Sequence, residues 1–296
     1  MRKLLRNILP QALIDIYKQS KKNKRTDKRI SLKENNQTVT EQQIFDALQN
    51  IGIAKGDTVL VHSSLSKIGY VDGDAKTIIN AFKNILGTEG TLAMPAFPGM
   101  GFSYDYLKSN PVFDVKRTPS KMGIITEEFR QQQHVIRSLH PTESICALGM
   151  QADYLTNSHF NQLTPYNVNS PFYKLCALHG KIILLGVDLN SLTNFHTLED
   201  AVADFKFPVY HQTIFNASLI DEQGNRLMMK TKVHNPVFSK KRQCNSFIKP
   251  FMDAGLMKSF DLGLAKCYVL DAHKLHHWML DNYKLKGITL YTPQGS

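Results

Sequence analysis

The sequence predicts an α/β protein built in layers. Short apolar, β-branched runs such as Thr58–His62 alternate along the chain with amphipathic segments such as Ala75–Leu86, a pattern typical of strands and helices that pack on one another. The chain has 296 residues, of which 42% are hydrophobic, so it can bury a sizeable core. We expect one folded domain over residues 37–296, preceded by a basic arm over residues 1–36.

The expected elements follow in order. A helix begins near Val39, where Thr40 can cap it and Gln43 can return the bond, and it ends at Gly52. A buried strand, a polar loop and a helix come next, at 58–62, 63–69 and 75–86, and then a strand at 90–96. Further along we expect a helix at 123–133, strands at 145–148 and 181–187, a hairpin at 209–219 and 226–233, and helices at 245–254 and 273–282 around a strand at 265–270.

The positive charge is concentrated at the start of the chain. Lys and Arg outnumber Asp and Glu by 36 to 25, a net charge of +11, and residues 1–29 hold ten basic and two acidic residues, which is +8 of it. Apolar residues at helical spacing, from Leu4 to Tyr17, precede the basic run 18–29. Such an arm can lie on an anionic membrane, or it can be a solvated arm that docks on the protein's own body. It lacks the interleaved aromatics of a nucleic-acid-binding segment.

The remaining composition indicates a cytoplasmic protein. We find no apolar run of roughly 18 residues, which a spanning helix needs, and no export signal. The four cysteines form no CxxC pair and are expected to be reduced core thiols: Cys146, Cys176, Cys244 and Cys267. A homodimer is the default oligomer.

Several common site motifs are absent from the sequence. Neither of the glycine-rich nucleotide motifs, GxGxxG and GxxxxGK[ST], is present, and there is no GxSxG nucleophile elbow. His273, His276 and His277 lack a cysteine or carboxylate at ligand spacing. We therefore expect no metal site.

Three loops carry groups that bind phosphates. The first, His62–Ser66, holds Ser63, Ser64 and Leu65 at the end of a strand. The second, 137–144, offers a cation, hydroxyls and an imidazole: Arg137, Ser138, His140 and Thr142. The third, Ser120–Gly123, opens a helix, where backbone N–H groups favour anions. Each could be ordinary turn chemistry, but together they suggest a ligand with several phosphates.

One His–Glu pair has the spacing of a general base. In Thr193–Asp200, His196 and Glu199 lie at i and i+3 and share one face of a helix that starts near Asn194. A carboxylate beside an imidazole fixes its tautomer and raises its basicity, as deprotonation of an amine requires. The alternative is a histidine bonded to its own glutamate for structural reasons.

From about Gln43 to Leu275 the chain resembles the aminoglycoside 3-N-acetyltransferase family. The resemblance rests on the order and spacing of several stretches: 56–65, 90–97, 119–123, 137–144, 165–175, 180–186 and 193–199. It implies a central mixed sheet flanked by helices, acetyl-CoA as the donor and an amino sugar as the acceptor. It further implies that Ser63, Ser64, Leu65, Arg137, Ser138 and His140 hold the cofactor.

The resemblance places the family's active-site histidine on His196, followed by Glu199. It fails at 230–236, where members carry an acidic cluster and this chain has Lys232 and His234 instead; we include His234 among the candidate catalytic residues. Together with the basic composition, this departure leads us to expect a nucleotide-linked amino sugar, destined for a surface polysaccharide, as the acceptor. The alternatives are an aminoglycoside-modifying resistance enzyme and a non-catalytic CoA-binding or membrane-docked scaffold.

Overall fold

The computed structural model describes residue 20 and residues 38–295. Apart from Ser20, the basic arm predicted over residues 1–36 lies outside this range, so the arm and its boundary remain predictions. No helix of the described residues is long and apolar enough to cross a membrane. The four cysteines are buried and form no disulfide.

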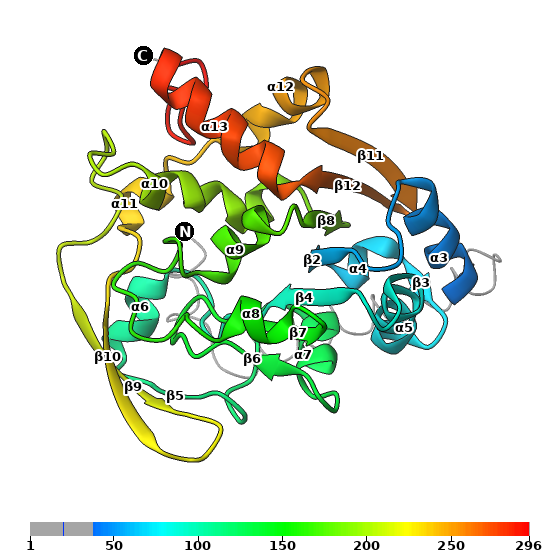
Figure 1. Cartoon of the computed structure of the whole chain (residues 1–296), viewed down its shortest axis with the longest axis horizontal. Coiled ribbons are helices and arrows are strands. Elements are labelled where there is room, and N and C mark those ends of the chain that lie inside the picture. The colour runs from blue at the N-terminus through cyan, green and yellow to red at the C-terminus, as the bar shows by residue number, and fades with distance from the viewer. Residues whose placement is uncertain (1–19, 21–37, 296) are drawn as a thin grey trace.

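A seven-stranded sheet forms the centre of the molecule (Figure 1), and it confirms the central mixed sheet that the family resemblance implies. In spatial order its strands are β11 (Met257–Leu262), β12 (Ala265–Asp271), β8 (Lys181–Leu185), β2 (Thr58–Ser63), β4 (Thr91–Pro95), β7 (Ile145–Gly149) and β6 (Ile136–Arg137). Strand β2 runs parallel to both β4 and β8, whereas β7 and β12 are antiparallel to their neighbours. The carboxyl ends of β2 and β8 therefore meet at one edge.

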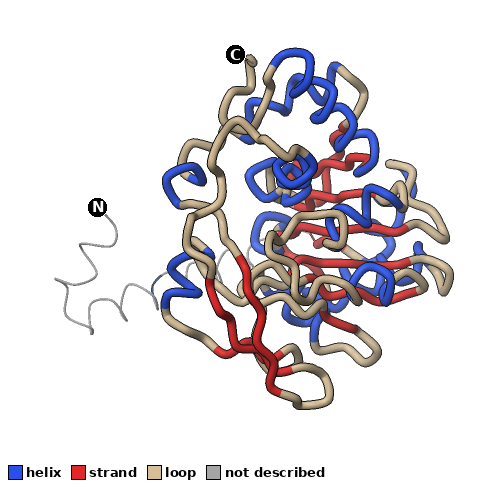
Figure 2. The backbone as a smooth tube through the Cα atoms, turned by 60° about the vertical axis from the view of Figure 1, so that its left-hand side comes forward, coloured by secondary structure: helices blue, strands red, loops and turns tan. Residues whose placement is uncertain are grey.

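Helices cover both faces of this sheet (Figure 2). Strands buried on both sides read as continuous apolar runs, and β2 sends Val59 and Val61 to one face and Leu60 to the other. On the first face lie α3 (Glu41–Asn50), α5 (Asp74–Leu86) and α7 (Ile124–Arg130). On the other lie α8 (Ala152–Thr156), α9 (Pro171–Ala177), α10 (Thr197–Ala201), α12 (Ile248–Asp253) and α13 (Ala272–Lys286).

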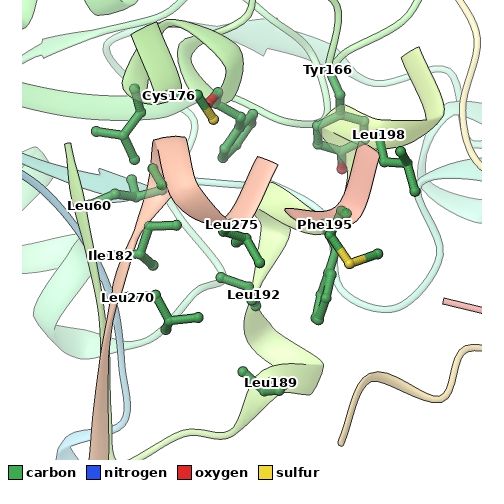
Figure 3. Packing of buried hydrophobic residues seen from close by; sticks show 14 of the residues in the cluster. Leu60, Tyr166, Cys176, Ile182, Leu189, Leu192, Phe195, Leu198, Leu270 and Leu275 are labelled. Atoms are coloured by element: carbon green, nitrogen blue, oxygen red, sulfur yellow. The ribbon is translucent and has the colours of Figure 1, made fainter. Parts of the chain in front are cut away.

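The second face holds the larger apolar cluster (Figure 3). Leu60 of β2 and Ile182 of β8 pack there with Leu275 of α13 and Phe195. Phe195 comes from a one-turn 3₁₀ helix, η2 (Thr193–His196), that leads directly into α10. The core thus anchors the segment that carries the predicted His–Glu pair.

The predicted start of α3 is confirmed in detail. Thr40 accepts a hydrogen bond from the backbone of Gln43, whose side chain accepts one from the backbone N–H of Thr40. The remaining short elements are β1 (Thr38–Val39), α4 (Leu65–Ile68), β3 (Tyr70–Val71), α6 (Ser103–Lys108), β5 (Val112–Asp114), η1 (Leu189–Ser191), α11 (Pro236–Ser239) and η3 (Cys244–Phe247).

The predicted hairpin forms a separate three-stranded sheet. Strands β9 (Phe215–Ile220) and β10 (Arg226–Thr231) are antiparallel, and β5 pairs in parallel with β9. Gly224 adopts φ +87° in the connecting turn, a conformation that L side chains rarely adopt. The hairpin's first strand begins at Phe215 rather than at Val209. Strand β10 leads directly to His234.

Candidate active site

A cavity of about 370 Å³ lies at the edge where β2 and β8 end. Ligands of α/β proteins commonly bind outside the carboxyl ends of parallel strands. His62 and Ser63 reach the cavity from the end of β2, and residues 187 and 190–193 line it after β8. His196 and His234 line the same cavity.

Glu199 is the centre of a buried hydrogen-bond cluster. His196 Nδ1 and His234 Nε2 both donate to Glu199 Oε2, at 3.0 and 2.6 Å. The hydroxyl of Tyr291 donates to the other carboxylate oxygen, Oε1, at 2.7 Å. The side chain of Glu199 is only 1% exposed, so these three donors take the place of water around its charge.

Two contacts fix the segment that carries His196. The side-chain amide of Asn194 donates to the carbonyl of Phe172 in α9 at 2.9 Å. Thr197 Oγ1 and His276 Nδ1 are 2.9 Å apart, which joins α10 to α13. These contacts hold η2 and α10 against neighbouring helices, and they leave His196 and Glu199 three residues apart on one turn.

Aromatic rings hold the two imidazoles in place. The ring of Tyr166 lies 4.9 Å from that of His196 and 5.3 Å from that of His234. Tyr210 stacks on the other histidine, His234, with ring centroids 4.9 Å apart and an interplanar angle of 8°. Packing of this kind restricts rotation of the imidazoles, so the hydrogen bonds to Glu199 stay in place.

The cluster carries a single negative charge at neutral pH. Burial raises the pKa of Glu199, but the two imidazoles outweigh this effect and hold that pKa well below its ordinary value. Burial, aided by positive Arg242, lowers the pKa of His196 to about 3 against the attraction of Glu199. Burial also lowers the pKa of His234. Glu199 is therefore ionised and both imidazoles are neutral.

This charge state suits general-base chemistry. Because His196 Nδ1 carries the proton that it donates to Glu199, the other ring nitrogen, Nε2, can accept a proton from a substrate amine. Glu199 then stabilises the imidazolium that forms. The structure thus brings together the three candidate catalytic residues His196, Glu199 and His234.

The same three residues could be considered as metal ligands. One ligand atom from each lies within 4.8 Å of the others, so a cation could be held there. These atoms already bond to one another, however, with both imidazoles donating to one carboxylate oxygen. We assign the cluster to proton transfer, and the expectation that no metal takes part stays a prediction.

The predicted cofactor residues divide into two groups. Ser63 lines the cavity, and Ser64 borders an adjoining pocket that also contains Lys67 and Lys266. Leu65 begins α4 immediately after this loop. Ser120 is buried, and its hydroxyl accepts a hydrogen bond from the backbone of Met122, which lines the cavity. The first and third loops therefore lie beside the cavity.

The second predicted loop faces inward. Arg137 donates from Nε to Ser144 Oγ at 3.0 Å, from Nη1 to the carbonyl of Thr118 at 2.5 Å, and from Nη2 to the carbonyl of Ala96. Among the described residues, the cavity lining includes none of this loop's four candidates: Arg137, Ser138, His140 and Thr142. All four are buried. Direct cofactor contact by these residues remains a prediction that their internal hydrogen bonds do not favour.

Three polar residues of the site are not among the residues predicted from the sequence. Glu143 lines the cavity from the loop between β6 and β7, and Ser103 Oγ donates to its Oε1 at 2.8 Å. Arg242 lines the cavity from the segment after α11. Tyr291 comes from the end of the chain. Glu143 lies inside the stretch 137–144 that resembles the family, whereas no local spacing in the sequence points to Arg242 or Tyr291.

The family model for aminoglycoside 3-N-acetyltransferases matches residues 60–283. Among the curated relatives, the chain is 34% identical over 209 residues to the aminoglycoside N(3')-acetyltransferase-like protein YokD of Bacillus subtilis, covering 65% of this chain and 74% of that one. It is 28% identical over 262 residues to aminoglycoside N(3)-acetyltransferase IX of Micromonospora chalcea, covering 82% and 92%.

Solved structures share the fold. Aminoglycoside acetyltransferase AAC(3)-Xa superposes with a TM-score of 0.75 at 24% identity, over 88% of this chain and 97% of that one. The YokD structure superposes with a TM-score of 0.67 at 29% identity, over 83% and 95%. The expected layered architecture with a mixed sheet is confirmed.

The expectation of a nucleotide-linked amino sugar as the acceptor is wrong. The family model and the named relatives point to aminoglycoside acetylation instead. The net charge of +11 is not a property of the site, because residues 1–29 hold +8 of it, and the acidic cluster missing at 230–236 does not exclude an acidic group elsewhere in the cavity. Among the described residues, the cavity lining holds one carboxyl group, Glu143, and one guanidinium, Arg242, so positive charge does not predominate there. Surface polysaccharide synthesis and a scaffold role have no support in these comparisons.

Proposed function

Because this chain belongs to the aminoglycoside 3-N-acetyltransferase family, we propose that it transfers an acetyl group from acetyl-CoA to the 3-amino group of an aminoglycoside. The chain is an acetyl-CoA-dependent N-acyltransferase. The acceptor class is supported by relatives named aminoglycoside N(3)-acetyltransferases, at 31% and 28% identity. The single observation that carries the mechanism is His196, held by buried Glu199 and facing a cavity at the sheet edge.

The proposed reaction is a direct transfer. His196 Nε2 takes a proton from the acceptor amine as the nitrogen attacks the thioester carbonyl carbon. The new N–C bond forms, the C–S bond breaks, and CoA leaves as a thiolate that takes up the proton. His234 and Tyr291 position Glu199 through their hydrogen bonds, and Glu199 balances the charge on His196.

A covalent acyl-enzyme is the main mechanistic alternative, since Cys244 lines the cavity. Burial raises the pKa of the Cys244 thiol to about 11. A thiol that stays protonated at neutral pH is a weak nucleophile. This favours direct attack by the amine, and Cys244→Ala should leave the turnover number within about threefold of wild type.

The first test measures release of CoA thiol from acetyl-CoA in the presence of sisomicin, apramycin, kanamycin or UDP-linked amino sugars. We expect turnover with at least one of the three aminoglycosides, and NMR of the product should place the acetyl group on the 3-amine. Turnover with the nucleotide sugars alone would overturn the proposal. The matched control for the His196→Ala variant is His277→Ala, which changes an exposed histidine on α13.

A further inference from the structure

The cavity has one lining carboxylic acid among the described residues, Glu143. It is 6% exposed, and two contacts fix its position. Its backbone N–H donates to His140 Nδ1 at 3.1 Å, and its Oε1 accepts a hydrogen bond from Ser103 at 2.8 Å. The ring of His140 stacks in turn on that of His159, 4.4 Å away. Glu143 is therefore a rigidly held carboxyl at the cavity wall.

Arg242 is a cation that lines the same cavity as Glu143. Within the part of the chain that the structure describes, Nε and Nη2 of Arg242 are buried without a hydrogen-bond partner. Burial lowers the pKa of Arg242, but attraction to Glu199 and Tyr291 outweighs this effect, so the guanidinium stays charged. Burial also raises the pKa of Glu143, against hydrogen bonds from Ser103 and Tyr166 and the attraction of Arg242.

Glu199 lies behind the two imidazoles and is already satisfied by three donors. Glu143 differs because it reaches the cavity itself. An ammonium group beside a desolvated carboxylate gains a charge-assisted hydrogen bond, which is about twice as strong as a neutral one. A second positive charge placed near Arg242 is instead repelled.

We propose that Glu143 is a specificity-determining residue that binds a second ammonium group of the acceptor, and that Arg242 limits how tightly polycationic acceptors bind. The inference rests on the proposed function for the identity of the acceptor. One amine of the acceptor lies at His196 and a second lies at Glu143, so diamines are preferred over monoamines. Arg242 supplies the repulsion that keeps additional amines away from the reacting one.

The test compares two acceptors with one and two amines, D-glucosamine and 2-deoxystreptamine, by calorimetric titration of the CoA-bound protein. Glu143→Gln should raise the dissociation constant of 2-deoxystreptamine about tenfold or more and that of D-glucosamine less than about threefold. Arg242→Gln should lower the dissociation constant of the diamine by about three- to tenfold. The control is Glu89→Gln, which changes an exposed carboxylate paired with Lys55.

If Glu143→Gln fails to fold, Glu143→Asp provides the test instead. It keeps the negative charge and should retain the preference for the diamine. Equal weakening of both ligands by Glu143→Gln would make Glu143 a purely structural residue and overturn the inference. An unchanged preference in that variant would overturn it as well. Failure of the proposed function looks different: the wild-type protein would acetylate no aminoglycoside, while the diamine preference would still depend on Glu143.

Discussion

At the scale of single residues, the site depends on one buried charge. Glu199 is almost fully shielded from bulk water, and three hydrogen bonds from His196, His234 and Tyr291 offset the cost of its burial. Because the carboxylate is already paired, it does not take the proton from His196. It keeps the imidazole in the tautomer whose Nε2 is free to act as a base.

Replacing His196 tests this arrangement directly. We expect His196→Ala to lower the turnover number by roughly 10²–10⁴-fold, the usual contribution of a general base. The Michaelis constant for acetyl-CoA should change little, since the imidazole acts on the amine. Steady-state thiol release measures both values. Turnover equal to that of wild type would rule out His196 as the general base.

Tyr291 belongs to the scale of elements, because it joins the segment after α13 to α10. Tyr291→Phe removes one of the three donors to Glu199 while keeping the ring. We expect the turnover number to fall by about tenfold, as the loss of one hydrogen bond to a charged group allows. A pH profile of the turnover number separates this positioning role from simple loss of packing: its acid limb should shift, whereas a merely structural change would leave the limb in place.

Arg137 also acts at the scale of elements. Its guanidinium joins β6 to the carbonyl of Ala96 after β4 and to that of Thr118, and it lies 4.7 Å from the ring of Phe113. Arg137→Gln should lower the free energy of unfolding by about 2–5 kcal/mol, because the buried carbonyl groups of Ala96 and Thr118 lose their donors. Denaturant unfolding measures this loss. A raised Michaelis constant for acetyl-CoA with unchanged stability would instead support the predicted contact between Arg137 and the cofactor.

Local patterns predicted the elements well and the site only in part. The capping pair at Thr40 and the apolar runs of β2 and β8 are local signals, so they could be found in the sequence. His196 and Glu199 share one helical turn, so their contact was also predictable. Glu143 and Arg242 come from segments about 100 residues apart, and only the packing of helices on the sheet brings them to one cavity.

At the scale of the whole molecule, every site residue identified above comes from residues 38–295, the part of the body that the structure describes. We expect deletion of residues 1–36 to leave kcat/KM within about twofold, because the cavity lining and the hydrogen bonds to Glu199 come from the described residues. If the arm binds membranes, the deletion should abolish co-sedimentation with anionic vesicles, with about 1 kcal/mol lost per basic residue near the surface. If the full chain and the chain without residues 1–36 co-sediment with the vesicles equally, the arm does not bind anionic membranes.

The protein should lose stability already at mildly acidic pH, because several histidines are buried in the neutral form. Burial lowers the pKa of His62, His159 and His196 to about 3 each, and that of His140 well below 6.5. Below pH 6.5 the unfolded chain binds protons that the folded chain does not, so stability falls as the pH falls. Each such group costs up to about 1.4 kcal/mol per pH unit. Urea midpoints should therefore drop steeply between pH 6.5 and 5, above the range where carboxylates titrate; a flat profile there would mean that these imidazoles are accessible to protons in the folded state.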